Sequence, residues 1–364
     1  MSTRITIRDV AERAGCGVAS VSRVLNNSGP ASEAVRERVL AAAKDLGFEF
    51  NELGRSLQSR RSRTLAVLVP SLRNDVFAMA IEGVQREANA AGYQILLACV
   101  NYGEDSEIEA VRTLVAKGVD GAILTVANPN DSMALDYLDS HAIPYCLMFN
   151  QPDRAVPSVG VDNVAAAALV ADALRKQGHE TVGFVALNFR ASERSRMRFE
   201  GLRTALLAQG APEPMVVEVA GTQDDLDNRI GEMLASDPGI TAIFASNDLV
   251  ALACIRALRR RHRSVPDDIS IVGFDGIDAG ELVEPTLATI VTPNAEMGRR
   301  AAASVIAAIT EGRPVVPRQV HLPFHFRSGA SLGRRRVGID VPADPGRRDT
   351  SPFEPQPATR KLTQ

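Results

Sequence analysis

The sequence predicts an α/β protein in which a small helical head precedes a two-lobed body built on parallel sheets. Two observations predict this class. Residues 4–47 contain three helix-length segments and no strand-like run. From Leu65 onward, short apolar runs rich in β-branched residues alternate with amphipathic segments of helical period, which is the pattern of parallel sheets covered by helices on both faces. Because these units are too many for one ordinary sheet, we expect two similar lobes.

Local signals place the three helices of the head. Thr6 can cap the first helix while Asp9, three positions later, returns the bond as in a capping box. Gly15 can end this helix because glycine tolerates a positive φ. A second helix is expected at about 17–25, and a third at about 33–46, each with an apolar stripe at helical spacing.

The strands and helices of the body follow in alternation. Seven runs are predicted to be strands: TLAVLVP, YQILLACV, DGAILTV, IPYCLMF, TVGFVAL, TAIFAS and ISIVGF. Helices are predicted at residues 75–91, 105–117, 164–177, 194–209, 224–236 and 248–261. Residues 48–63 are polar and basic, so they are predicted to be a linker. The segment 334–364 is rich in Arg, Pro and Asp without periodicity, which predicts a disordered tail.

The charge of the chain is unevenly distributed. Residues 1–63 contain eleven Arg and Lys against seven Asp and Glu, a net charge of +4, whereas the whole chain has a net charge of -3. The remainder therefore has a net charge of -7. A basic head on an acidic body predicts a polyanionic partner for the head alone, although a solvated basic surface is the alternative.

The composition also indicates the cellular compartment in which the protein is expected to function. No stretch approaches the roughly 20 consecutive apolar residues of a membrane helix, and the N-terminus lacks the apolar region of a signal peptide. The four cysteines are far apart in sequence and have apolar or small neighbours; they are Cys16, Cys99, Cys146 and Cys254. We expect them to be reduced, in a cytoplasmic protein.

The segment GCGVASVSRVLN (residues 15–26) admits three interpretations. A zinc site fails because no second cysteine or histidine lies within the head. A dinucleotide-binding loop fails because the third glycine of G-x-G-x-x-G is absent and a helix, not a strand, precedes it. A helix–turn–helix remains, with small side chains that allow a helix to approach base edges closely and with Arg23 suited to phosphate or base contact.

The same head resembles that of the lactose-repressor (LacI/GalR) family. The resemblance begins with TIRDVAERAGCGVASVSRVLN and continues through VGVDN, AIFASNDLVAL, SVPDDISIVGFDGID and PTLATIVTPNAEMGRRAA. It covers residues 4 to about 333 in the expected order and spacing. It implies a homodimeric transcriptional regulator with a DNA-reading head, a hinge helix and a two-lobed sensor like the periplasmic sugar-binding proteins.

The resemblance also implies a division of the chain. The expected units are a helix–turn–helix DNA-binding domain at 1–50, a hinge helix and linker at 51–63, and a ligand-sensing and dimerisation domain at 64–333. Within the last, one lobe is expected to comprise about 64–161 and 292–323, and the other about 162–291 and 324–333.

Residues matching the family's DNA contacts lie in the head and the hinge. They are Thr6, Val18, Ala19, Ser20, Ser22, Arg23, Asn26, Asn51 and Leu57. Leu57 matches the leucine that wedges between base steps from the minor groove. Three positions depart from the family pattern: Gly17 stands where Ser or Thr is usual, Phe50 where Pro is usual, and Gly54 where a helix former is favoured. We therefore expect a hinge helix that forms poorly without DNA.

Residues matching the family's ligand contacts are Asn74, Phe77, Arg198, Asn247 and Asp275. The last two follow strand-like runs, and open α/β sheets bind ligands at the carboxyl ends of strands. Arg194 and Arg196 are alternatives to Arg198 as the ligand-binding arginine. Core packing is the alternative role for Phe77. Asp248 is expected to cap the next helix.

The segment SLRNDVFAMAIEGV most resembles the gluconate-regulator branch of the family, which implies a sugar or sugar acid as effector. The expected partners are double-stranded operator DNA, this effector and a second copy of the chain. No cofactor, metal site or enzyme activity is expected, since no catalytic motif is found. The alternatives are a cytoplasmic sugar-binding protein with an impaired head and a nonspecific DNA binder. Four prolines after residue 344 favour a dimer over a tetramer built on a C-terminal heptad helix.

Overall fold

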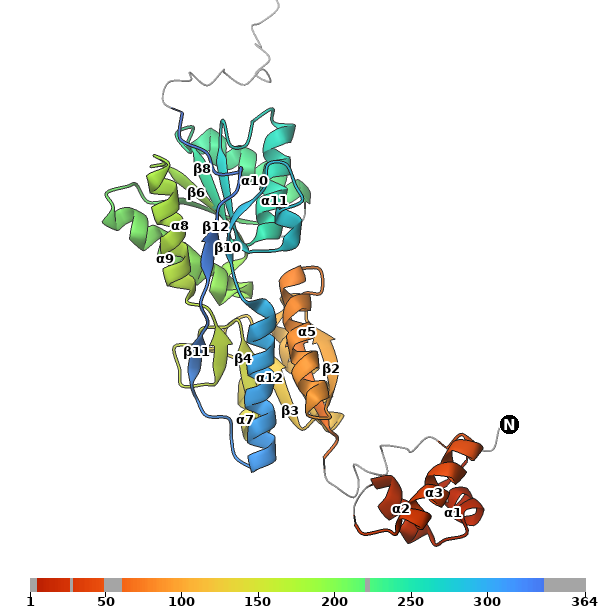
Figure 1. The fold of residues 1–364 in the computed structure, drawn as a ribbon. Helices are drawn as coiled ribbons and strands as arrows, with labels where there is room; N and C mark the ends of the chain where they lie inside the picture. The colour runs from red at the N-terminus through yellow and green to blue at the C-terminus, as the bar shows by residue number, and fades with distance from the viewer. Residues whose placement is uncertain (1–4, 27–28, 49–60, 220–222, 337–364) are drawn as a thin grey trace, which may run out of the picture.

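The computed structural model of this 364-residue chain describes residues 5–26, 29–48, 61–219 and 223–336. The described part consists of a three-helix head and two six-stranded sheets flanked by helices (Figure 1). This arrangement confirms the predicted α/β class.

The head is formed by α1 (Ile7–Ala14), α2 (Val18–Asn26) and α3 (Glu33–Leu46). Gly15 and Gly47 end α1 and α3 with φ of 61° each, the left-handed conformation that glycine favours. The apolar stripes of the three helices meet in a small core of Val10, Ala11, Ala14, Val21, Val24, Val39, Ala42 and Ala43.

The first sheet, with its helices, forms the N lobe. Its strand order is β11-β5-β4-β3-β1-β2, and every pairing is parallel. The strands are β1 (Thr64–Val69), β2 (Gln94–Cys99), β3 (Gly121–Leu124), β4 (Tyr145–Met148), β5 (Ser158–Gly160) and β11 (Gln319–His321). Its helices are α5 (Asp75–Ala90), α6 (Glu104–Ala116), α7 (Met133–Ser140) and α12 (Asn294–Glu311).

The second sheet, with its helices, forms the C lobe. Its strand order is β12-β10-β9-β8-β6-β7, and β12 is antiparallel to β10 while the other pairings are parallel. The strands are β6 (Val182–Leu187), β7 (Met215–Val219), β8 (Ala242–Ala245), β9 (Ser270–Asp275), β10 (Ala288–Val291) and β12 (His325–Arg327). Its helices are α8 (Asn163–Lys176), α9 (Glu193–Ala208), α10 (Gln223–Ser236) and α11 (Asp248–Arg260), with short 3-10 turns at Phe189–Ala191 and Asp278–Gly280.

The chain passes between the two sheets three times: after β5, after β10 and between β11 and β12. All seven predicted runs contain strands, whereas β5, β7, β10, β11 and β12 were not among them. Within the described ranges, no helix is both long and apolar enough to cross a membrane.

The end of the linker is fixed to the N lobe. The backbone amides of Ser62 and Arg63 each donate to the carboxylate of Asp120 at 2.8 Å, and the guanidinium of Arg61 donates to the carbonyl of Ile309 at 2.7 Å. The last residues before the linker reaches β1 are therefore held by both β3 and α12.

The predicted tail begins against the C lobe. The amide of Arg335 donates to the carbonyl of Gln177 at 2.8 Å, and its guanidinium pairs with Glu180 at 3.1 Å. Residues beyond Arg336 lie outside the described part, as do most of the predicted hinge and its residues Asn51 and Leu57.

Candidate nucleic-acid interface and ligand pocket

The exposed face of α2 presents small side chains and one arginine. Val18 is 42% exposed, and Ala19 and Arg23 are also exposed, whereas Val21 and Val24 on the opposite face are buried in the head's core. Side chains this small allow the backbone of a helix to approach base edges in a major groove closely. The exposed face of α2 is therefore the candidate DNA-reading surface.

The remaining predicted DNA contacts surround this face. Ser20 and Ser22 are half-buried. Arg23 folds back along the helix, and its Nε donates to the carbonyl of Ala19 at 3.3 Å. Asn26 is the last residue of α2, and its side chain lies outside the described part.

Thr6 precedes α1, and Asp9 satisfies its polar groups. The carboxylate of Asp9 accepts a hydrogen bond from the Thr6 amide at 2.7 Å and one from the Thr6 hydroxyl at 2.8 Å. These bonds lower the pKa of Asp9. The bond that Asp9 was predicted to return to Thr6 is thus present, and the Thr6 hydroxyl must turn away from Asp9 to donate to a phosphate.

Gly17 begins α2. Its carbonyl accepts from the amides of Ser20 at 2.8 Å and Val21 at 3.1 Å, which makes it the residue that caps the helix. A Cβ atom at Gly17 would have no other heavy atom within 4 Å. A larger capping residue therefore fits without any rearrangement of the head.

All five predicted ligand residues line one pocket between the two lobes. Asn74 and Phe77 come from the N lobe, and Arg198, Asn247 and Asp275 come from the C lobe. Both lobes direct carboxyl ends of strands toward this pocket: β1 and β2 from one sheet, and β8 and β9 from the other. The expectation that these residues meet at strand ends is consistent with the rule for open α/β sheets.

Arg198 is buried and held on several sides. Its Nε donates to Asn163 at 2.9 Å, another of its nitrogens donates to the carbonyl of Ser246, and its guanidinium lies 3.5 Å from the centroid of the Phe274 ring. Its nearest carboxylate is Asp275, at 3.9 Å. Burial lowers the pKa of Arg198 to about 10, and the charge of Asp275 opposes this shift.

Asp275 has both an unusual backbone conformation and a shifted pKa. Its φ of 123° lies in a region that L-residues rarely adopt, and such strain is concentrated at functional sites. Burial raises its pKa to about 7, against the opposing effect of Arg198 and of a side-chain hydrogen bond from Asn74 in the other lobe. Asp275 is therefore poised between its charged and neutral forms near neutral pH.

The expected role of Asp248 as a helix cap is wrong. Asn247 caps α11, since its Oδ1 accepts from the amide of Val250 at 2.9 Å. One oxygen of Asp248 accepts from the amides of Gly276 at 2.8 Å and Ile277 at 2.9 Å, and the other accepts from the hydroxyl of Thr289 at 2.6 Å. Its carboxylate points toward the turn after β9, away from the start of its own helix, and so holds Asp275 in place.

Phe77 belongs both to the core and to the pocket. It is only 5% exposed and meets Phe149 edge to face, with ring centroids 5.3 Å apart and planes at 80°. Both rings line the pocket. The two interpretations of Phe77 are therefore compatible.

Of the two alternative arginines, Arg194 lines the pocket and Arg196 is exposed. One nitrogen of Arg194 donates to the carbonyl of Val126 in the N lobe at 3.0 Å and to Glu193 at 3.1 Å. Its other two guanidinium nitrogens receive no hydrogen-bond partner from the described residues.

Glu193 links the start of α9 to the N lobe. Its carboxylate accepts from the side chain of Asn150 and from the backbone amides of Gln151 and Arg194, each at 2.9 Å, and its own amide donates to Ala127 at 3.0 Å. Glu193 is 2% exposed. These buried bonds tie the two lobes together beside the pocket.

Several pocket residues were missed or left open by the sequence. Tyr102 lines the pocket just after β2, and Phe149 lines it directly after β4. Their positions directly after apolar runs were a usable signal. What the sequence did not reveal is which of the side chains after each run turns inward.

The pocket is nearly closed. Its cavity volume is about 40 Å³, enough for one or a few water molecules. A ligand of sugar size therefore requires the lobes to separate.

A two-lobed domain with a polar pocket at its strand ends, joined to a helix–turn–helix head, defines a ligand-responsive DNA-binding regulator. Residues 6–51 match the family described as bacterial regulatory proteins, lacI family, and residues 62–329 match periplasmic binding proteins and the sugar binding domain of the LacI family. The chain therefore belongs to the LacI family of transcriptional regulators.

Individual relatives agree with this family assignment. The HTH-type transcriptional regulator GntR of Escherichia coli K12 is 31% identical over 331 residues, covering 90% of this chain and 99% of GntR. The repressor CytR of the same organism is 30% identical over 303 residues, covering 82% of this chain and 88% of CytR.

Solved structures agree as well. A LacI-family regulator from Silicibacter pomeroyi superposes with a TM-score of 0.78 at 27% identity, covering 91% of this chain and 100% of that one. A complex of the regulator CelR with cellobiose superposes with a TM-score of 0.66 at 28% identity, covering 90% of this chain and 100% of that one. The lac repressor dimer bound to operator superposes with a TM-score of 0.80 at 24% identity, covering 90% of this chain and 99% of that one. This likeness supports the assignment of the fold.

The Gly17→Ser substitution is expected to strengthen DNA binding. A serine there has room for its side chain, caps α2 better than glycine by a few tenths of a kcal/mol, and adds a hydroxyl that can donate to a phosphate. Operator affinity, measured by fluorescence anisotropy, should rise several-fold. Gly17→Ala, which adds a Cβ without the hydroxyl, is the control; an equal gain in both variants would contradict this explanation.

The stability of the protein is expected to depend on Asp275 between pH 6 and 8. Because its folded pKa of about 7 lies above the ordinary aspartate pKa of 3.8, the folded protein binds this proton more tightly than the unfolded chain. The free energy of unfolding should therefore rise by about 1 kcal/mol as the pH falls from 8 to 6.

This dependence can be measured by urea unfolding of the wild type and of Asp275→Asn, which cannot titrate. The free energy of unfolding of the wild type, relative to that of Asp275→Asn, should rise as the pH falls from 8 to 6. A difference that stays constant from pH 6 to pH 8 would show that Asp275 does not titrate in this range.

Proposed function

We propose that this protein is a homodimeric repressor that binds palindromic operators and whose DNA affinity is set by a sugar acid held between the lobes. The observation that most supports this is the convergence of side chains from both lobes on one polar pocket, in a chain that also presents an exposed recognition helix. A ligand that contacts both lobes favours one lobe arrangement, and coupling of this kind is typically worth about 1–3 kcal/mol.

The charges of the pocket favour an acid over a neutral sugar. Among the residues that line it, Arg194 and Arg198 are cationic and Asp275 is the acidic one. Arg198 is already engaged by Asn163, Ser246 and Asp275. Arg194 has guanidinium nitrogens to spare, and a guanidinium binds a carboxylate through two parallel hydrogen bonds.

Hydroxyl groups find partners in the same pocket. Asp275 in its ionised form accepts from them, while the side-chain amides of Asn74 and Asn247 can donate to them. Phe77 and Phe149 offer apolar surface for the carbon skeleton. We place the protein in the cytoplasm, where its DNA is, and propose that it binds its effector without converting it.

The first experiment tests operator binding and the response to effector together. A palindrome is selected from a random DNA pool by the full-length protein, and its affinity is measured by fluorescence anisotropy with gluconate and with glucose as its neutral counterpart. A tight palindrome whose affinity changes with gluconate supports the proposal. If no palindrome can be selected, the regulator is not a sequence-specific one.

The role of Arg194 is tested by Arg194→Ser. Loss of charged hydrogen bonds worth about 1.5–3 kcal/mol should weaken gluconate binding about ten- to a hundredfold. Arg196→Ser is the matched control, since Arg196 lies on the same helix and is exposed. Equal losses in both variants, or none in either, would contradict the assignment of Arg194 to the carboxylate.

A further inference from the structure

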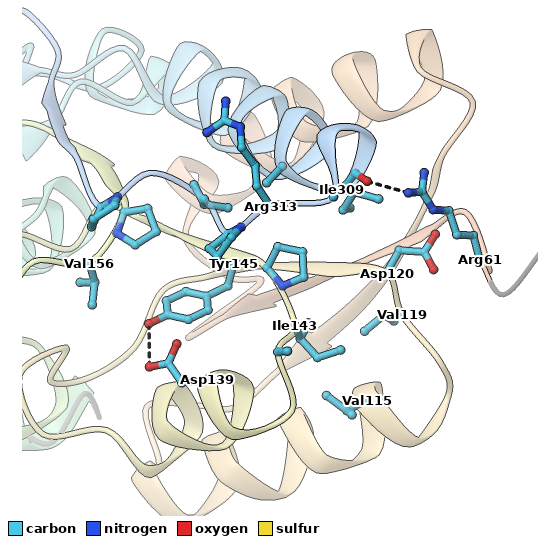
Figure 2. A pocket seen from close by; sticks show the side chains of 18 of the residues that line it. Arg61, Val115, Val119, Asp120, Asp139, Ile143, Tyr145, Val156, Ile309 and Arg313 are labelled. Carbon is cyan, nitrogen blue, oxygen red and sulfur yellow. Dashed lines mark hydrogen bonds between the residues drawn. The ribbon is translucent and has the colours of Figure 1, made fainter.

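A large cavity lies away from the lobe interface. It has a volume of about 940 Å³ and lies at the base of the N lobe, between the C-terminal end of α12, the segment that follows it and the residues just before β4 (Figure 2). Ligand pockets generally have volumes of about 300–1,000 Å³. This volume suits a small organic molecule, whereas the interlobe pocket in the same structure is almost closed.

The middle of this cavity, which we call the basal pocket, is apolar. Its walls include Val115, Val119, Ile143, Val156, Ile309 and Val315. Prolines add further rigid apolar surface, among them Pro144 and Pro314. The middle of the pocket therefore favours an apolar, ring-shaped body over a sugar.

One end of the basal pocket has hydrogen-bonding groups. The Tyr145 hydroxyl donates to an oxygen of Asp139 at 3.3 Å (Figure 2). Burial raises the pKa of Tyr145 to about 12, so the phenol stays protonated and remains a donor to Asp139. The second oxygen of Asp139 receives no hydrogen bond from the described residues. Asp139 is exposed, so this oxygen is open to accept a hydrogen bond from a ligand's hydroxyl group.

The charges of the basal pocket do not favour an anion. The Arg313 guanidinium pairs with Glu311, and Arg61 is engaged by the carbonyl of Ile309. Of the two carboxylates, Asp120 is occupied by the linker amides. The open acceptor on Asp139 suits a neutral molecule that donates a hydrogen bond.

The other end of the basal pocket is formed by the linker anchor. Arg61 and Asp120, which hold the linker on α12 and β3, both line it, and Figure 2 shows them together at the end opposite Asp139. A ligand that extends from Asp139 to this end of the pocket contacts the groups that fix the chain between the head and the body. Its binding must therefore differ between states in which this anchor is formed or broken.

We propose that the basal pocket is a second ligand site, which binds a neutral aromatic or alicyclic molecule bearing a hydroxyl group and transmits its binding to the linker through Arg61 and Asp120. The hydroxyl donates to Asp139, and the ring lies among the apolar side chains. This ligand class differs from that of the interlobe pocket, so the regulator has two chemically distinct inputs.

The test uses 1-naphthol as the probe and naphthalene as the same ring system without the hydroxyl. Binding to the full-length protein is followed by probe fluorescence. Ala155 is exposed at the rim of the basal pocket, so Ala155→Trp fills the entrance without disturbing the core. Ala208→Trp, at an exposed position of α9 in the other lobe, is the matched control.

The expected result is saturable binding of 1-naphthol at one site per chain, weakened at least tenfold by Ala155→Trp and unchanged by Ala208→Trp. Asp139→Ala should weaken 1-naphthol several-fold, the worth of one hydrogen bond, and leave naphthalene unaffected. Absence of saturable binding, or equal binding to Ala155→Trp, overturns the proposal.

The connection to the linker is tested separately. In the wild type, saturating 1-naphthol should change operator affinity by fivefold or more, the lower end of typical coupling between sites, and in Ala155→Trp it should not. Binding with an unchanged operator affinity overturns the transmission through Arg61 and Asp120.

Discussion

The arrangement of the two lobes depends on charged groups that are buried where they meet. Glu193, Arg194, Arg198 and Asp275 are each less than 10% exposed. Moving a charged group out of water costs several kcal/mol, which only close hydrogen bonds and opposite charges offset. Each of these four is met by such partners, and several partners come from the opposite lobe. Separation of the lobes exposes these charges to water and also breaks the bonds that compensate their burial, so the open and closed arrangements can lie close in free energy.

A ligand with hydroxyl and carboxylate groups acts on this balance directly. In the closed arrangement the shifted pKa values of Arg198 and Asp275 show that burial outweighs their mutual attraction. A polar ligand supplies hydrogen bonds that the protein alone does not. It therefore stabilises whichever lobe separation allows both lobes to reach it. The position of Asp275 in this process is set in advance, because Asp248 holds the two amides that follow it.

The sequence predicted the long elements well and the short ones poorly. Seven strands of four to six residues were found because burial on both faces requires continuous apolar sequence. Two others of that length were missed: β7, whose residues alternate between partly buried and exposed, and the four-residue β10. Strands β5, β11 and β12 have three residues each, too few for any periodicity to register. They pair through backbone groups brought together by the rest of the fold.

The candidate site shows the same division. Asn247 and Asp275 were predicted as pocket residues from their positions at strand ends and from the family resemblance. Asp248 was predicted to be a helix cap, because a carboxylate at the start of a helix is ordinarily a cap. Asp248 departs from this because the turn after β9 presents two amides to it. The contact between Asp248 and Gly276 joins residues that are 28 positions apart in the chain. No local pattern in the sequence around either residue predicts it.

Helix α12 physically joins the ligand pocket to the linker. Before its first turn, the amide and the hydroxyl of Thr292 both donate to the carbonyl of Asp275 at 3.2 Å. Near its other end, the carbonyl of Ile309 accepts from Arg61. Its 18 residues span about 27 Å at 1.5 Å per residue.

Helix α12 is also packed closely against its neighbour α5. A Cβ atom at Gly298 would lie 1.9 Å from the carbonyl oxygen of Ala80, so α12 and α5 pack backbone against backbone. Asn74, whose side chain lowers the pKa of Asp275, caps α5. A displacement of Asp275 must therefore either break its bonds to Thr292 or carry this helix pair with it. The second outcome displaces the carbonyl that holds Arg61, at the point where the chain leaves for the DNA-binding head.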